Sequence, residues 1–91
     1  MKQNLLHKDI SFGGVSLVER ALFAKHLSVM LRAGLTITEA LDIAAESSKG
    51  KMRATIESVR QSVLSGTTLS QAFGGHPQVF PPLFVQTTYA G

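Results

Sequence analysis

The fold of this 91-residue chain is decided between residues 16 and 39, which read SLVERALFAKHLSVMLRAGLTITE. Both ends of this stretch have the form Ser/Thr-x-x-Glu, the capping box of a helix start. The hydroxyl of the first residue accepts a hydrogen bond from the backbone N–H three residues later. The glutamate side chain accepts one from the backbone N–H of the first residue. Gly34 lies between the two boxes, where a glycine typically follows a helix end. The stretch therefore predicts a helix, a short turn and the start of a second helix.

The same signals recur along the chain and predict further helices. A third capping box runs from Thr68 to Gln71, and glycines follow the other expected helix ends. Pro81 and Pro82 suit the first turn of a last helix. No segment alternates apolar and polar residues, so we expect no strand. The expected helices lie near residues 17–33, 37–48, 51–65, 69–74 and 82–91, after a flexible lead-in at residues 1–15. The predicted fold class is all-α, an antiparallel helical bundle of about five helices.

The composition excludes several classes of protein. The length suits one domain, and 44% hydrophobic against 16% charged residues excludes intrinsic disorder. The chain has no cysteine, which excludes a disulfide framework and thiolate metal sites. It contains neither a signal peptide nor an apolar stretch long enough to span a bilayer. The net charge of +3 suits an anionic partner without requiring one.

The first predicted helix is apolar on two sides. Phe23, Leu27 and Met30 lie on one face, and a second face carries further apolar residues, Val18, Leu22, Val29 and Ala33. Such a helix is either central in the bundle or shared with a partner, and the pattern alone leaves both open. The last predicted helix is also apolar, with little chain left to cover it, so we expect a truncated bundle or an oligomer. The candidate self-association residues are Val18, Leu22, Val29, Leu83 and Phe84.

Residues with catalytic or ligand-binding potential are sparse. The histidines at 7, 26 and 76 have no partner at the spacing of a zinc site. Glu39 belongs to a capping box, and the segment Ser47–Lys51 lacks the glycine spacing of a phosphate-binding loop. The sequence therefore predicts no catalytic residue, no cofactor and no metal site.

Basic residues form the other candidate site. They gather on the polar strip of the first helix and around the start of the third. The pattern is typical of an ordinary solvated face, but it also suits an acidic partner or anionic lipid headgroups. The candidate docking residues are Lys25, Arg32, Lys49, Lys51, Arg53 and Arg60.

A run of short motifs gives the chain a family resemblance. They read LFAKHLSVML at 22–31, AGLT at 33–36, EAL at 39–41, GTTLS at 66–70 and HPQVFP at 76–81. Their order and spacing from Val15 to Gly91 resemble the cytoplasmic domain of the type II secretion system F family. These are inner-membrane platform proteins of type II secretion, type IV pilus assembly and competence.

The resemblance implies an architecture and a function. The family domain has about six helices, so residues 16–91 are expected to form a helical cytoplasmic domain whose C-terminal part is missing, together with the membrane spans. The implied role is a non-enzymatic platform at the inner membrane, facing the cytoplasm. It would dock the secretion or pilus ATPase, contact other inner-membrane assembly proteins and itself, and support assembly of pilin or pseudopilin filaments and protein secretion.

Two other functions remain open at this point. One is a stand-alone helical adaptor between proteins. The other is a helix-turn-helix DNA-binding domain, because two predicted helices flank the short turn at residues 33–36. Glu39, Asp42 and Glu46 on the second of these helices would repel phosphate, so we expect no nucleic-acid partner.

Overall fold

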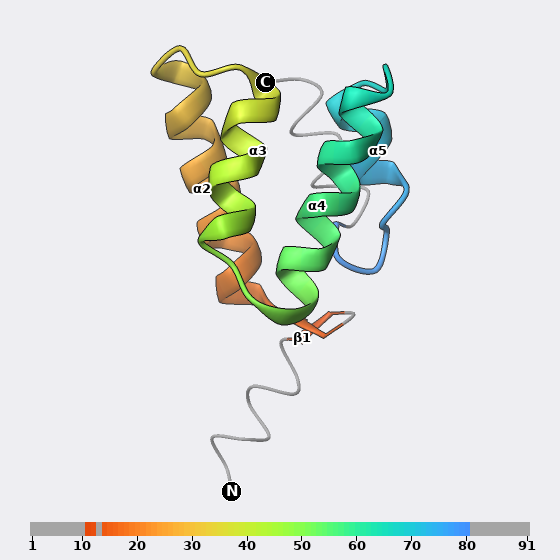
Figure 1. Ribbon diagram of the computed structural model, residues 1–91. Helices are drawn as coiled ribbons and strands as arrows, with labels where there is room; N and C mark the ends of the chain where they lie inside the picture. The colour runs from red at the N-terminus through yellow and green to blue at the C-terminus, as the bar shows by residue number, and fades with distance from the viewer. Residues whose placement is uncertain (1–10, 13, 81–91) are drawn as a thin grey trace, which may run out of the picture.

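The computed structural model describes residues 11–12 and 14–80, which fold into a small helical bundle (Figure 1). The elements are β1 (Ser11–Phe12), β2 (Val15–Ser16), α2 (Leu17–Arg32), α3 (Ile37–Glu46), α4 (Gly50–Leu64) and α5 (Leu69–Gly74). The all-α class is confirmed, and the four predicted helices begin and end within two residues of their expected bounds. The fifth predicted helix, with Leu83 and Phe84, lies outside the described residues.

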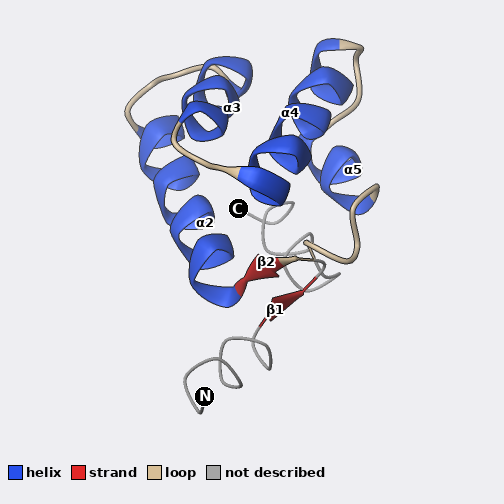
Figure 2. Ribbon diagram, turned by 60° about the horizontal axis from the view of Figure 1, so that its bottom comes forward, coloured by secondary structure: helices blue, strands red, loops and turns tan. Residues whose placement is uncertain are grey.

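A short hairpin precedes the helices, and here the prediction of no strand was wrong. Ser11 pairs with Ser16 and Phe12 with Val15 in an antiparallel ladder. Two residues per strand are too few to show an alternating pattern, so periodicity could not indicate these strands. Val15 is fully buried, and β2 leads directly into α2 (Figure 2). A residue assigned to the lead-in therefore belongs to the core.

All three predicted capping boxes are present, at the starts of α2, α3 and α5. In the box of α3, the Glu39 N–H donates to Thr36 Oγ1 at 3.1 Å and the Thr36 N–H donates to Glu39 Oε1 at 2.9 Å. The turn before this box needs a glycine, because Gly34 has φ +100°, a conformation unfavourable for other residues. By contrast Lys49, the N-cap residue of α4, makes no side-chain capping hydrogen bond.

Small residues on α3 let its neighbours approach closely. Ala40 and Ala45 are fully buried and Ala44 nearly so, beside the buried Leu41. In sequence order α3 follows α2 and precedes α4, and it packs against both helices (Figure 1). The side chains of Ile56 and Val59 on α4 are also fully buried. The bundle is thus centred on α3, with α2 and α4 on its two sides.

Three aromatic rings pack against one another in a second part of the core. The ring centroids of Phe73 and Phe80 are 4.6 Å apart, and Phe23 lies 5.5 Å from Phe80 and 6.0 Å from Phe73. Both Phe73 and Phe80 are fully buried. The cluster joins α2, α5 and the turn that follows α5, and so fixes the start of α2 against the rest of the bundle.

The capping box of α3 should contribute measurably to stability. We expect Thr36→Ala to lower the free energy of unfolding by about 1 kcal/mol. The backbone N–H of Thr36, and then its hydroxyl, lower the pKa of Glu39 below its ordinary value of 4.5. Because the folded-state pKa of Glu39 is depressed, the box stabilises the fold fully above the ordinary pKa of the group. This stabilisation is lost as pH falls through the folded-state pKa.

Urea unfolding of wild type, Thr36→Ala and Thr36→Ser between pH 7 and pH 3 checks this expectation. The serine variant keeps a hydroxyl and serves as the control, so it should follow wild type. The alanine variant should be less stable at pH 7 but keep a similar acid sensitivity, because the backbone N–H at position 36, which lowers the pKa of Glu39 most, remains. Equal stability of the alanine and serine variants at pH 7 would contradict the role of the box.

Candidate functional site

The second apolar face of α2 is exposed. Val18, Leu22 and Val29 keep 58%, 47% and 53% of their surface accessible, whereas Phe23 and Leu27 on the first face are buried. The sequence left open whether α2 is central in the bundle or shared with a partner. Within the described part of the chain, α2 is covered on one side only. This exposed face could form an interface, and exposure is what self-association through Val18, Leu22 and Val29 would need.

A groove runs beside this face, between α2, α3 and the start of α4, where Lys49 and Met52 line it. It encloses about 510 Å³. Its wall on α2 includes Leu22, His26 and Val29, and its wall on α3 includes Ile43. His26 is exposed here. Ile43, which is 43% exposed, was not among the predicted site residues, although it is the one large apolar residue on the polar side of the second predicted helix.

The candidate docking residues fall into two exposed groups. Lys25 and Arg32 lie on α2, where Arg32 Nη2 donates to Ser28 Oγ at 3.0 Å. Lys49, Lys51 and Arg53 lie at the start of α4, close to the hairpin. The stem of Lys51 packs beside Gly14 in the hairpin turn. The structure therefore separates residues that the sequence analysis treated as one set.

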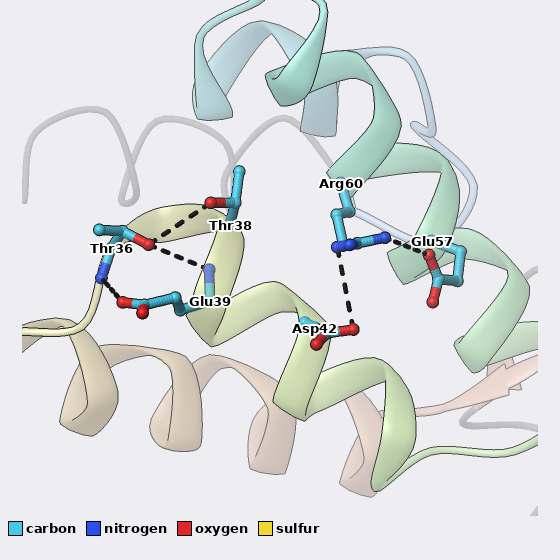
Figure 3. A network of polar contacts seen from close by, with 6 residues as sticks. All are labelled: Thr36, Thr38, Glu39, Asp42, Glu57 and Arg60. Atoms are coloured by element: carbon cyan, nitrogen blue, oxygen red, sulfur yellow. Dashed lines mark hydrogen bonds and ion pairs between the residues drawn. The ribbon is translucent and has the colours of Figure 1, made fainter.

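Arg60, the sixth candidate docking residue, is engaged in ion pairs between α3 and α4. Its Nη1 lies 3.2 Å from Glu57 Oε1 on the same helix, and its Nε lies 3.9 Å from Asp42 Oδ1 on α3 (Figure 3). The side chain is only 28% exposed. These contacts link α3 to α4 and balance the charge of Arg60, so its position suits a structural role better than docking.

Arg20 is a buried cation that the sequence analysis did not single out. It is 8% exposed, and its Nη1 donates to the carbonyl of Val79 at 3.4 Å. The contact ties α2 to the turn that carries Phe80. The available signal was its spacing, because Arg20 shares the core-facing stripe with Phe23 and Leu27. A charge on such a stripe indicates a buried polar contact.

The described residues offer little chemistry. No group of three His, Cys, Asp or Glu side chains among them could hold a metal ion. His76 Nε2 lies 3.0 Å from Ser58 Oγ, but within residues 14–80 no carboxylate hydrogen-bonds to the other ring nitrogen, as a catalytic triad needs. None of the helices at residues 17–74 is long and apolar enough to cross a bilayer.

Comparison with known proteins gives these surfaces a context. Residues 23–91 match the family of the type II secretion system protein F. The type II secretion system protein F of Aeromonas hydrophila is 39% identical over 79 residues, which cover 86% of this chain and 20% of that protein. The type IV pilus assembly protein PilC of Myxococcus xanthus is 32% identical over 94 residues, covering 99% of this chain and 22% of the relative.

A third relative agrees with these two. The type II secretion system protein F of Vibrio cholerae is 35% identical over 79 residues, again 86% of this chain and 20% of the relative. The chain thus spans about a fifth of the length of the curated relatives that it matches. Because the family match covers most of the chain and includes every described helix except the first part of α2, the chain belongs to the family of type II secretion system protein F.

Proposed function

We propose that this chain is a non-enzymatic domain of an inner-membrane assembly platform, facing the cytoplasm and docking the ATPase of its secretion or pilus machine. Through that contact it supports assembly of pilin or pseudopilin filaments beside other inner-membrane assembly proteins. The family supports the setting, since its members carry secretion and pilus names. The observation that carries the docking role is the exposed basic start of α4, formed by Lys49, Lys51 and Arg53.

The charge of this basic start is unusual for a helix. The N-terminus of a helix is the positive end of its dipole, where carboxylates stabilise and cations destabilise. Glu19 and Glu39 occupy the first turns of α2 and α3, as expected on these grounds. The first turn of α4 has no acidic residue. Dipole and side chains therefore add to one positive potential, which suits an acidic surface of a partner.

The basic start of α4 is also mechanically coupled to the core. Met52 lies between its basic residues, Ile56 and Val59 follow on the same helix, and all three are buried against the bundle. Arg60, further along α4, pairs with Asp42 on α3. A load applied at the start of α4 is therefore carried by packed side chains rather than by a loop. This rigidity is what a platform needs to pass on motion of an ATPase.

Two charge-matched double variants test the docking site. Lys51→Glu with Arg53→Glu reverses one lysine and one arginine at the start of α4. Lys25→Glu with Arg32→Glu makes the same charge change on α2. We expect the first pair to weaken binding of this domain to its cognate ATPase by tenfold or more and the second pair to leave it within about twofold. Isothermal titration calorimetry at 50 mM and 300 mM salt measures both affinities.

Each outcome of this titration is decisive. A loss confined to the α2 pair would move the docking site to α2. Wild-type domain that shows no binding to the ATPase at either salt concentration would overturn the proposed function. Circular dichroism of both variants confirms that they are folded, and Arg60 is left unchanged because its ion pairs belong to the bundle.

A further inference from the structure

The outer face of α2 combines apolar and basic side chains. Five exposed residues of this face lie within about 80° of one another around the helix axis, namely Val18, Leu22, Lys25, Val29 and Arg32. They lie opposite Leu27, which is buried in the core. The helix is about 24 Å long, and it lies at one side of the bundle (Figure 1). The outer face is therefore a continuous strip along the edge of the molecule.

Acidic side chains are absent from this outer face. Glu19 is the one carboxylate of α2. It lines the groove toward α3, and its Oε1 accepts a hydrogen bond from the Ser16 N–H at 3.0 Å. The exposed Glu39 and Glu46 belong to α3, across the groove. The charge on the outer face of α2 is therefore positive only.

The second half of the bundle shows what the fold requires at such positions, because α4 and α5 repeat the design of α2 and α3. Gly66 follows Gly34 by 32 residues, and both have a positive φ, +106° and +100°. Thr68 follows Thr36 by 32 residues, and both cap the next helix. Buried positions correspond at the same spacing, in the pairs Phe23/Thr55, Leu27/Val59, Ala40/Ala72 and Leu41/Phe73. Equivalent positions of α2 and α4 therefore meet similar packing demands.

The residues of α4 that correspond to the outer face of α2 have a different character. The pairs are Leu22/Ala54, Lys25/Glu57 and Val29/Gln61. The hairpin design thus accepts small, acidic and polar residues at these three positions. Folding does not require the apolar and basic side chains of α2. Because exposed apolar residues that gather in one patch mark an interaction site, the outer face of α2 indicates contact with something outside the bundle.

We propose that the outer face of α2 lies on the surface of a bilayer that contains anionic lipids. A helix with exposed apolar side chains beside Lys and Arg binds such a surface through buried apolar area and attraction to the headgroups. Val18, Leu22 and Val29 enter the boundary between headgroups and acyl chains. Lys25 and Arg32 reach the lipid phosphates with their charged ends while their aliphatic stems cover apolar surface. The contact goes beyond the proposed ATPase docking, which uses the start of α4.

The carboxylates of α3 determine which side of the molecule faces the lipid. An anionic surface repels Glu39 and Glu46, so α3 and the groove should turn away from the bilayer. The surface potential falls off within a Debye length of about 8–10 Å, and packed helices are about 8–10 Å apart. A tilt that lifts α3 by one helix spacing therefore removes most of the repulsion and keeps the basic residues of α2 at the surface.

Tryptophan probes test this contact directly, because the chain contains no tryptophan. Val29→Trp places a probe on the outer face of α2, and Leu64→Trp places one at a similarly exposed position on α4. The vesicles consist of phosphatidylcholine with about one-third phosphatidylglycerol, which supplies the negative surface. We expect the emission of Val29→Trp to shift to shorter wavelength on these vesicles and to be quenched by brominated acyl chains. The emission of Leu64→Trp should show neither change.

Neutral variants of the basic residues test the charge contribution, in the background of Val29→Trp. Each basic residue near an anionic surface contributes about fivefold in affinity. We therefore expect Lys25→Gln with Arg32→Gln to weaken vesicle binding by tenfold or more. The matched control, Lys51→Gln with Arg53→Gln, removes the same charge from the start of α4 and should change binding by less than about threefold. Vesicle titrations followed by tryptophan emission measure both affinities.

The other outcomes would overturn the proposal. Equal shifts of the two tryptophan probes would place the contact elsewhere. Wild type that fails to sediment with the anionic vesicles, or that binds pure phosphatidylcholine equally well, excludes an anionic surface. A shift of Val29→Trp that grows with protein concentration in the absence of vesicles assigns the face to a second copy of the chain. ATPase docking uses Lys51 and Arg53, so its failure is distinguishable from failure of the lipid contact.

Discussion

Replacing Phe73 with alanine is expected to lower the free energy of unfolding by about 3–5 kcal/mol. Phe73 is fully buried, and its ring contacts those of Phe23 and Phe80. Truncation removes apolar surface from the core and leaves a cavity between α2, α5 and the turn after α5. Since the free energy of unfolding of small domains is only about 5–15 kcal/mol, this change should remove a large part of the stability of the fold.

Thermal and urea unfolding followed by circular dichroism measure the effect of Phe73→Ala. Leu64→Ala is the control, because Leu64 is 55% exposed and its truncation should change stability by no more than about 0.5 kcal/mol. Phe73→Leu should lie between the two. A loss below about 1 kcal/mol for Phe73→Ala would show that the aromatic cluster does not hold the bundle together.

Enlarging Ala45 should produce the second large effect. Ala45 is fully buried on α3, which packs against both α2 and α4. A leucine at this position has no space unless the helices move apart, and overpacking of a core costs about 1–3 kcal/mol. The displacement would also strain the contact between Arg60 and Asp42. We therefore expect Ala45→Leu to fall at the upper end of that range.

The matched control for Ala45→Leu is Ala54→Leu. Ala54 lies on α4 and is exposed, so the same substitution adds the same atoms without displacing a neighbour. Helix propensities of alanine and leucine are similar, and the control should change stability by no more than about 0.5 kcal/mol. Equal stability of the two leucine variants would mean that α3 does not set the spacing of the bundle.

Local sequence signals were sufficient to predict the helices. Capping boxes and glycines act within a few residues of where they occur, so Ser16, Thr36 and Thr68 mark helix starts without knowledge of the fold. The two apolar faces of α2 also followed from helical periodicity, including the exposed Val18, Leu22 and Val29. Features that depend on one helix alone were therefore accessible from the sequence.

Features that depend on contacts between two elements could not be predicted from the sequence. The hairpin at Ser11–Ser16 is too short to have a period, and the burial of Val15 depends on its packing in the core cluster that the helices form. The role of Arg60 depends on Asp42, which the bend between α3 and α4 brings alongside. Likewise Ile43 becomes part of a groove only through the packing of α2 on α3.

The most direct test of the platform role is to map where the ATPase touches the domain. Titration of the ¹⁵N-labelled chain with its cognate ATPase, followed by amide NMR signals, gives that map residue by residue. The account predicts that the signals of residues 49–53 weaken first, while those of Val29 and Leu64 persist until higher ATPase concentrations. Uniform persistence of all signals at saturating ATPase, or loss that begins on α2, would contradict it.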